Sequence, residues 1–217
     1  MKIKTIMRTN VPTLTNTDTI EDAIALMESV SIRHIPITNG HTAVVGIVSD
    51  RDIRDIRPST LSVTKEATDF LQPVTKIMST PVLTAHPDDD VQEVARLFFQ
   101  NRVGCLPVVD NDRLVGLITE SDMLYSLTKL LGADQPSSII EVCVHNRPGQ
   151  LADVAAVFKK ERINIVSAVA YPSKKAEKYM LSFRVQTIDP RRIIAALQLA
   201  GYEVYNPLFP ALGGSNE

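Results

Sequence analysis

Residues 46–52 read GIVSDRD, and residues 116–122 read GLITESD. Each copy places a glycine and two apolar residues before a hydroxyl side chain, Ser49 or Thr119, with an aspartate three positions later. An apolar run is typical of a buried strand, and Ser/Thr-x-x-Asp is typical of a helix start. The stretch therefore predicts one strand-to-helix unit that occurs twice in the chain.

The repetition extends on the N-terminal side of both copies. Residues 6–14 (IMRTNVPTL) reappear as residues 77–84 (IMSTPVLT), and residues 32–37 (IRHIPI) reappear as residues 103–108 (VGCLPV). Each copy predicts an extended start, a helix, a two-stranded hairpin and a second helix. A unit of this length has little core of its own, so we expect the two copies to pack as a pair.

Turn and cap residues define the predicted elements more closely. Strands are expected at residues 35–38 and 43–48 around Asn39-Gly40, and at residues 106–109 and 113–118 around Asp110-Asn111. The first helix of each copy should be capped by Asp18 or Thr19, and by one of Asp88, Asp89 and Asp90. We interpret the acidic run 88–90 as capping rather than as a metal site.

Composition excludes several classes of protein. The 217 residues are 44% apolar, which is enough for a buried core, and allow one or two domains. A net charge of −2 argues against a nucleic-acid-coating protein, and no apolar run reaches the roughly 18 residues of a membrane span. Cys105 and Cys143 lack metal-ligand spacing and are expected to be buried thiols of a cytoplasmic, unsecreted protein. No nucleophile, P-loop or zinc-protease motif indicates an enzyme.

The repeated Ser/Thr-x-x-Asp allows two interpretations. One is a capping box that only ties off the helix. The other is a nucleotide site, in which the hydroxyl and the helix N-terminus hold a phosphate and Asp52 or Asp122 accepts the two ribose hydroxyls. Glycine before the pair would let a flat base approach the backbone. Val11, Ile35, Val82 and Leu106 would supply apolar walls.

The ordered set of repeated motifs over residues 1–130 resembles the CBS-domain family. CBS pairs bind AMP, ADP, ATP or other adenosyl ligands in clefts, so the resemblance implies a regulatory nucleotide ligand and no catalytic cofactor. The residues implied to bind it are Ser49, Asp52, Thr119, Asp122, Arg33, His34, Arg51, Val11, Thr13, Ile35, Pro36, Val82, Thr84, Leu106 and Pro107.

The two expected clefts differ in charge. The first copy carries Arg33, His34 and Arg51, and the second carries Gly104, Cys105 and Glu120. A unit charge near a phosphate matters by about 1 kcal/mol in water and by more in a desolvated cleft. We therefore expect one cleft to favour a phosphorylated ligand. Since related pairs share their clefts between repeats, Arg33 and His34 can serve either one.

The last third of the chain follows another pattern. Residues 132–137 are a linker by composition, and strands and helices then follow in the order β-α-β-β-α-β, which predicts a ferredoxin-like sandwich. With residues 146–151 (NRPGQL) and 163–165 (INI), this segment resembles the ACT family. The resemblance implies an amino-acid site or a dimer contact; an unliganded turn and helix is the alternative. The residues implied are Asn146, Gly149, Gln150, Leu151, Asn164 and Ile165.

Together these segments predict an α+β (mixed α/β) protein. The expected boundaries are CBS repeats at 1–66 and 67–131, the linker at 132–137, an ACT-like domain at 138–210 and a disordered tail at 211–217. This order, with residues 56–59 (IRPS), resembles the bacterial acetoin-utilisation (AcuB) family. It implies a homodimeric regulator of acetoin or central carbon catabolism, acting on a partner enzyme; a ligand-free interaction scaffold is the alternative.

Overall fold

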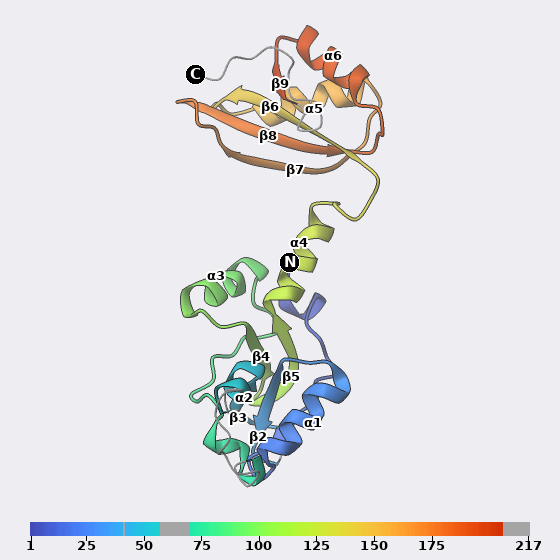
Figure 1. Cartoon of the computed structure of the whole chain (residues 1–217). Helices are drawn as coiled ribbons and strands as arrows, with labels where there is room; N and C mark the ends of the chain where they lie inside the picture. Colours follow the sequence, from blue (N-terminus) through green and yellow to red (C-terminus); the bar gives the residue numbers. More distant parts are fainter. Residues whose placement is uncertain (41, 57–69, 206–217) are drawn as a thin grey trace. The chain divides into compact units, whose positions relative to one another are not determined.

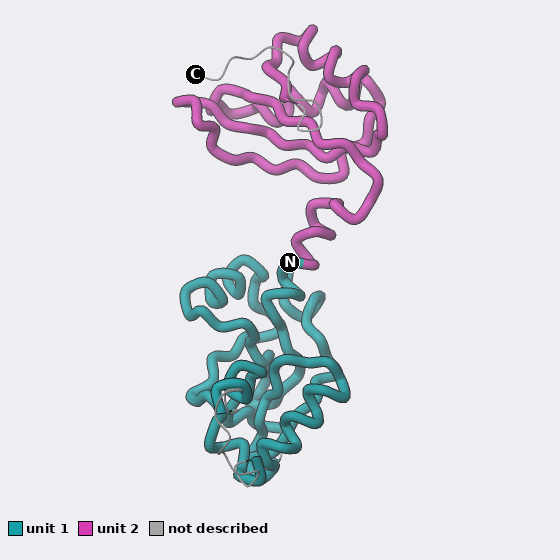
Figure 2. The backbone as a smooth tube through the Cα atoms, viewed as in Figure 1, with its two compact units in different colours: residues 1–124 teal, residues 125–217 magenta. Residues whose placement is uncertain are grey.

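A computed structural model describes residues 1–40, 42–56 and 70–205 of the chain. The chain forms two compact units, Met1–Leu124 and Tyr125–Glu217 (Figure 2). The division between the units lies inside helix α4 (Glu120–Leu130), so the expected linker 132–137 falls in the second unit. The expected boundary between residues 66 and 67, residues 57–59 of the IRPS stretch and the tail 211–217 lie outside the described residues.

The first repeat combines a three-stranded sheet with two helices. Strand β2 pairs in parallel with β1 and antiparallel with β3. Helix α1 begins at Thr19, whose hydroxyl accepts a hydrogen bond from the Asp22 backbone N–H, so Thr19 rather than Asp18 is the N-cap. The elements are η1 (Ile3–Thr5), β1 (Leu14–Thr15), α1 (Ile20–Val30), β2 (His34–Thr38), β3 (Val44–Ser49) and α2 (Asp50–Ile56).

The second repeat has the predicted helix, hairpin and helix. Its hairpin turns at Asn111 and Asp112, one position later than expected, and both residues take the left-handed backbone conformation. Helix α3 begins at Asp90, whose carboxylate forms an ion pair with Lys2 at 3.2 Å instead of capping the helix. The elements are η3 (Val74–Lys76), α3 (Val91–Asn101), β4 (Cys105–Asp110), β5 (Arg113–Thr119) and α4.

The short 3-10 helix at the start of each repeat, η1 or η3, packs into the hydrophobic core of the other repeat. Ile3 of η1 is fully buried in the core of the second repeat, together with Phe98 and Leu106. Val74 of η3 is fully buried in the core of the first repeat, together with Ile35. The repeated Ile-Met motif thus joins the two copies, because each copy completes the core of the other.

The repeated glycines serve this packing. A Cβ at Gly116 would lie 2.7 Å from Met7 Sδ, and a Cβ at Gly46 would overlap the Met78 side chain. The methionine of the opposite copy thus packs against each glycine, and the expectation that these glycines let a base approach the backbone stays a prediction.

The second unit has the predicted order of strands and helices. Its antiparallel sheet runs β7-β8-β6-β9, with α5 and α6 on one face (Figure 1). Ile140, Val142 and Val144 of β6 face the core, as their alternation predicts, and pack with Phe158 and Phe183. The elements are β6 (Ser138–His145), α5 (Gln150–Lys160), β7 (Ile165–Pro172), β8 (Lys178–Val185), α6 (Arg191–Leu199) and β9 (Glu203–Tyr205).

Candidate functional site

Both Ser/Thr-x-x-Asp motifs form capping boxes. Ser49 closes β3, and its backbone N–H and hydroxyl donate to Asp52 Oδ2 at 2.7 and 2.6 Å. Thr119 closes β5, and its N–H and hydroxyl donate to Asp122 Oδ2 at 3.1 and 2.6 Å. Each aspartate N–H returns a bond to the hydroxyl oxygen. The capping boxes are therefore present in both copies and engage one of the two oxygens of each carboxylate, and the nucleotide interpretation stays a prediction.

The second carboxylate oxygen distinguishes the two copies. Asp122 Oδ1 accepts hydrogen bonds from Nε and Nη2 of Arg8, at 3.0 and 2.9 Å. Two backbone hydrogen bonds of 2.9 Å between Arg8 and Leu117 hold the arginine in place. Ser79 occupies the equivalent position in the other half and makes the same backbone bridge to Ile47, but its side chain is short and neutral.

One cavity brings together predicted residues from both repeats. It has a volume of about 360 Å³ and is called here the inter-repeat cavity. Arg33 and His34, at the start of β2, line it together with Thr119 of the second repeat. The lining residues are Arg8, Ser31, Ile32, Arg33, His34, Gly104, Leu117, Thr119, Glu120 and Ser121.

The charge of the inter-repeat cavity comes from its two arginines and from Glu120. Burial lowers the pKa of His34 below its ordinary value, and the carboxylates of Asp50 and Asp52 only partly oppose this shift. His34 is therefore a neutral imidazole at pH 7. A Cβ at position 104 would lie 3.3 Å from His34 Nε2, so glycine at this position leaves room for the ring.

Other predicted residues are distributed more widely. Val11 and Thr13 line a second cavity of about 200 Å³, together with Thr9 and with Gly116 of β5. Arg51 is exposed on α2, Val82 is half-buried, and Thr84 is exposed in the segment before α3. None of these three lines either of the two cavities above.

The expected apolar walls need correction. Ile35 and Leu106 are fully buried in the two hydrophobic cores, and Pro36 and Pro107 are buried in the same strands. The Ile35 and Leu106 side chains face these cores, so they are not available as walls for a base. Pro36 and Pro107 follow them in the strands and therefore face the opposite side of each hairpin.

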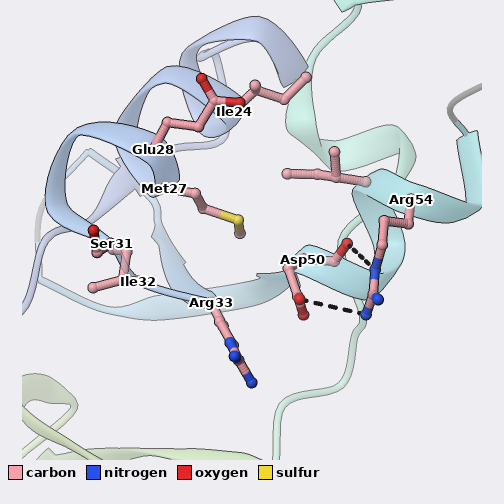
Figure 3. A pocket seen from close by; sticks show the side chains of 9 residues that line it. Ile24, Met27, Glu28, Ser31, Ile32, Arg33, Asp50 and Arg54 are labelled. Carbon is pink, nitrogen blue, oxygen red and sulfur yellow. Dashed lines mark hydrogen bonds and ion pairs between the residues drawn. The ribbon is translucent and has the colours of Figure 1, made fainter.

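A third cavity, of about 430 Å³, lies between the end of α1 and the start of α2 (Figure 3). Met27 and Ile53 form part of its lining, and Asp50 and Arg54 form an ion pair of 3.4 Å beside it. Arg33 borders both this cavity and the inter-repeat cavity. Sequence reasoning singled out only Arg33 of this lining, because most of the other lining residues lie on α1 and α2 outside the repeated Ser/Thr-x-x-Asp.

Arg8 is a charged residue of the inter-repeat cavity that sequence reasoning missed. The signal was present, since the repeated segment reads Ile-Met-Arg at residues 6–8 and Ile-Met-Ser at residues 77–79. Cys105, at the position equivalent to His34, is a buried free thiol, as is Cys143. Burial and the nearby Asp122 raise the pKa of Cys105 to about 12.

The six residues implied by the ACT resemblance are not gathered in any cavity described above. Gly149 precedes α5 in the left-handed conformation, Gln150 bonds to Asp153, and Leu151 is 49% exposed. The Asn146 N–H donates to the Glu177 carbonyl. At the start of β7, the Asn164 amide donates to the Gln186 side chain, and Ile165 packs against the core. Their role as a ligand site stays a prediction.

Residues 1–40, 42–56 and 70–205 contain neither a membrane-spanning helix nor a metal-binding cluster. No helix there is long and apolar enough to cross a membrane. No group of three or more His, Cys, Asp or Glu residues in the same ranges is placed to hold a metal ion.

Several known proteins resemble this chain over more than half of its length. The CBS domain-containing protein YhcV of Bacillus subtilis is 30% identical over 121 residues, which are 56% of this chain and 81% of YhcV. The crystal structure of a protein from Vibrio cholerae, described as an acetoin utilization protein (AcuB), matches with a TM-score of 0.54 and 35% identity, covering 62% of this chain and 95% of that one.

A third similar structure is the CBS domain pair of protein MJ0100 in complex with 5′-methylthioadenosine and S-adenosyl-L-methionine. It matches with a TM-score of 0.51 and 26% identity, covering 62% of this chain and 98% of that one. Some relatives are much longer than the matched region. Inosine-5′-monophosphate dehydrogenase of Methanocaldococcus jannaschii is 34% identical over 116 residues, but the match spans only 21% of that enzyme.

Family models match the two units separately. The ACT domain model matches residues 138–198, in the second unit. The CBS domain model matches residues 3–59 and 74–129, which together are more than half of the sequence. The chain therefore belongs to the CBS-domain family, with two CBS domains followed by an ACT domain.

Proposed function

We propose that the protein is a regulatory sensor whose inter-repeat cavity binds an adenosyl ligand that carries phosphate, such as AMP, ADP or ATP. The observation that carries this proposal is that three residues, Thr119, Arg8 and Arg33, line one cavity. Guanidinium groups and helix N-termini are the groups that proteins use most often to hold phosphate.

The second copy of the motif is better suited to phosphate than the first. Helix α4 is 11 residues long and begins at Glu120, directly after Thr119. The positions equivalent to Arg8 and Arg33 are Ser79 and Gly104. We therefore propose that the cleft at Thr119, and not the cleft at Ser49, is the one that prefers a phosphorylated ligand.

Size and similarity support an adenosyl ligand. A volume of about 360 Å³ falls within the range of small-molecule sites, which runs from about 300 to 1,000 Å³. The CBS pair of MJ0100, which is 26% identical to this chain, holds two adenosyl compounds in its crystal structure. In this chain the aspartate that would accept the ribose hydroxyls is Asp122.

Isothermal titration calorimetry of the full chain with AMP, ATP and S-adenosylmethionine tests the proposal. Asp122→Asn should weaken AMP binding by about tenfold or more, because hydrogen bonds to a charged group contribute about 1.5–3 kcal/mol. Asp52→Asn is the matched control, since it alters the same capping box in the other copy. Equal losses in the two variants would contradict the assignment to the second copy.

A second candidate function is a ligand-free interaction scaffold. The observation in its favour is that both capping boxes are complete without a ligand. A thermal-shift series separates the two functions, because a ligand that binds only the folded state raises the melting temperature with its concentration. No rise with any adenosyl compound would favour the scaffold. In both functions we propose that the chain regulates a partner enzyme and is not itself an enzyme.

For the ACT domain we propose a role in forming a homodimer or in sensing an amino acid. Strand β7 is an edge strand, and its Val169 and Tyr171 are 41% and 38% exposed. Light scattering at micromolar concentration tests the dimer, and thermal shift with a panel of amino acids tests the sensor. A monomer whose melting temperature no amino acid changes would contradict both.

We further propose a cytoplasmic regulator of acetoin or central carbon catabolism. Two buried free thiols suit a reducing compartment, and the similarity to the Vibrio cholerae protein supports the pathway. Growth on acetoin of a strain that lacks the gene tests the pathway. Growth equal to that of the parent strain would contradict it.

A further inference from the structure

We propose that Arg8 competes with the ligand for Asp122, and that this competition makes the inter-repeat cavity reject uncharged nucleosides. This inference rests on the proposed function. In the structure both oxygens of Asp122 are already engaged, Oδ2 by the capping box and Oδ1 by two nitrogens of Arg8. A ribose that uses Oδ1 must first displace the guanidinium group.

Displacing Arg8 without a replacement partner is costly. The Asp122 side chain is only 15% exposed, whereas that of Arg8 is 55% exposed, so the ion pair is partly shielded from water on the carboxylate side. Bonds between a guanidinium and a carboxylate are charge-assisted and stronger than neutral ones. A ligand that brings only hydroxyl groups replaces a charged partner with a neutral one and leaves Arg8 unpaired.

A phosphate removes this cost. Arg8 lines the same cavity as Arg33 and Thr119, where the phosphate is proposed to lie. The guanidinium group can therefore pass from the carboxylate to the phosphate while the ribose takes Oδ1. The backbone of Arg8 stays bonded to Leu117 during this exchange, so only the side chain needs to move.

The other copy provides an internal contrast. Ser79 stands where Arg8 would be, and no arginine or lysine among the described residues forms an ion pair with Asp52. A nucleoside that reached Asp52 would meet no competitor of this kind among residues 1–40, 42–56 and 70–205. The selection against uncharged ligands is thus a property of the cavity that Arg8 borders.

The experiment compares the affinities of AMP and adenosine for the full chain by calorimetry, with Arg8→Gln as the variant. Lys4→Gln is the matched control, because Lys4 is a cation on the same N-terminal segment whose 2.7 Å ion pair with Asp88 is exposed. Arg8→Gln should bind adenosine several-fold more tightly and AMP more weakly, so that the preference for AMP falls by about tenfold or more. Lys4→Gln should leave the preference unchanged.

Two results would overturn the inference alone. If Arg8→Gln weakens AMP binding without tightening adenosine binding, Arg8 is a simple phosphate ligand. If neither affinity changes, Arg8 has no part in the site. A wild-type chain that binds neither compound overturns the proposed function as well. Arg8→Lys, which keeps the charge but not the two-nitrogen contact, gives the same comparison if the glutamine variant does not fold.

Discussion

Replacing Gly116 by alanine tests how closely the N-terminal segment of the first repeat packs on strand β5 of the second repeat. The new Cβ would lie 2.7 Å from Met7 Sδ and 2.9 Å from the carbonyl oxygen of Arg8. The carbonyl cannot retreat freely, because it accepts the backbone hydrogen bond from Leu117. Overpacking of this kind costs about 1–3 kcal/mol, and we expect the upper half of that range.

The matched variant is Gly46→Ala in the other copy. The nearest atoms to its Cβ all belong to the side chain of Met78, and a methionine side chain has three rotatable bonds with which to adapt. We therefore expect Gly46→Ala to cost about 1 kcal/mol less than Gly116→Ala. A further Met7→Ala substitution should relieve only part of the Gly116→Ala cost, since the Arg8 carbonyl remains.

Urea unfolding of the full chain, followed by circular dichroism, measures these differences as shifts of the transition midpoint at constant slope. A Gly116→Ala protein within about 0.5 kcal/mol of wild type, which is the usual range of neutral surface changes, would refute the close packing of Met7 and Arg8 on β5.

Three further predictions concern the cores and the titrating groups. Phe158→Ala should lower the stability of the second unit by about 3–5 kcal/mol, because Phe158 is fully buried against Phe183, and a loss under 1 kcal/mol in urea unfolding would contradict that core. The folded protein should lose stability as the pH falls from the unfolded pKa of His34, about 6.5, toward its lower folded pKa, because only the unfolded state then binds the proton. The unfolding free energy of His34→Gln should show a smaller slope between pH 7.5 and 5 than that of wild type, and an equal slope would count against the buried neutral imidazole. The thiol of Cys105, with its pKa raised to about 12, should react with a thiol reagent far more slowly in the native protein than in urea, as the labelling rate of a Cys143→Ser variant would show.

The fold was largely predictable from the sequence because its signals are local or repeated. Alternation in residues 139–145 identified the central strand of the second unit, and the two Gly-apolar-Ser/Thr stretches identified the strand-to-helix units. The one-residue error at the second hairpin arose because both Asn111 and Asp112 tolerate the left-handed conformation, so composition alone does not fix the turn.

The site was less predictable because residues of both repeats form it, and the sequence does not show which residues of one repeat contact the other. Arg33 and His34 lie next to the first Ser/Thr-x-x-Asp in sequence order, yet they line the cavity of the second. Ile35 and Leu106 looked like walls because an apolar residue in a strand can face either a ligand or a core. The contact between Arg8 and Asp122 joins residues 114 positions apart, and no local pattern announces it.

A crystal structure of the full chain with AMP tests the central claim most directly. The account predicts that AMP lies in the inter-repeat cavity with its phosphate at Thr119 and Arg33, its ribose on Asp122 Oδ1, and Arg8 turned from the carboxylate to the phosphate. AMP bound elsewhere, or bound with the Arg8–Asp122 pair still intact, would contradict it.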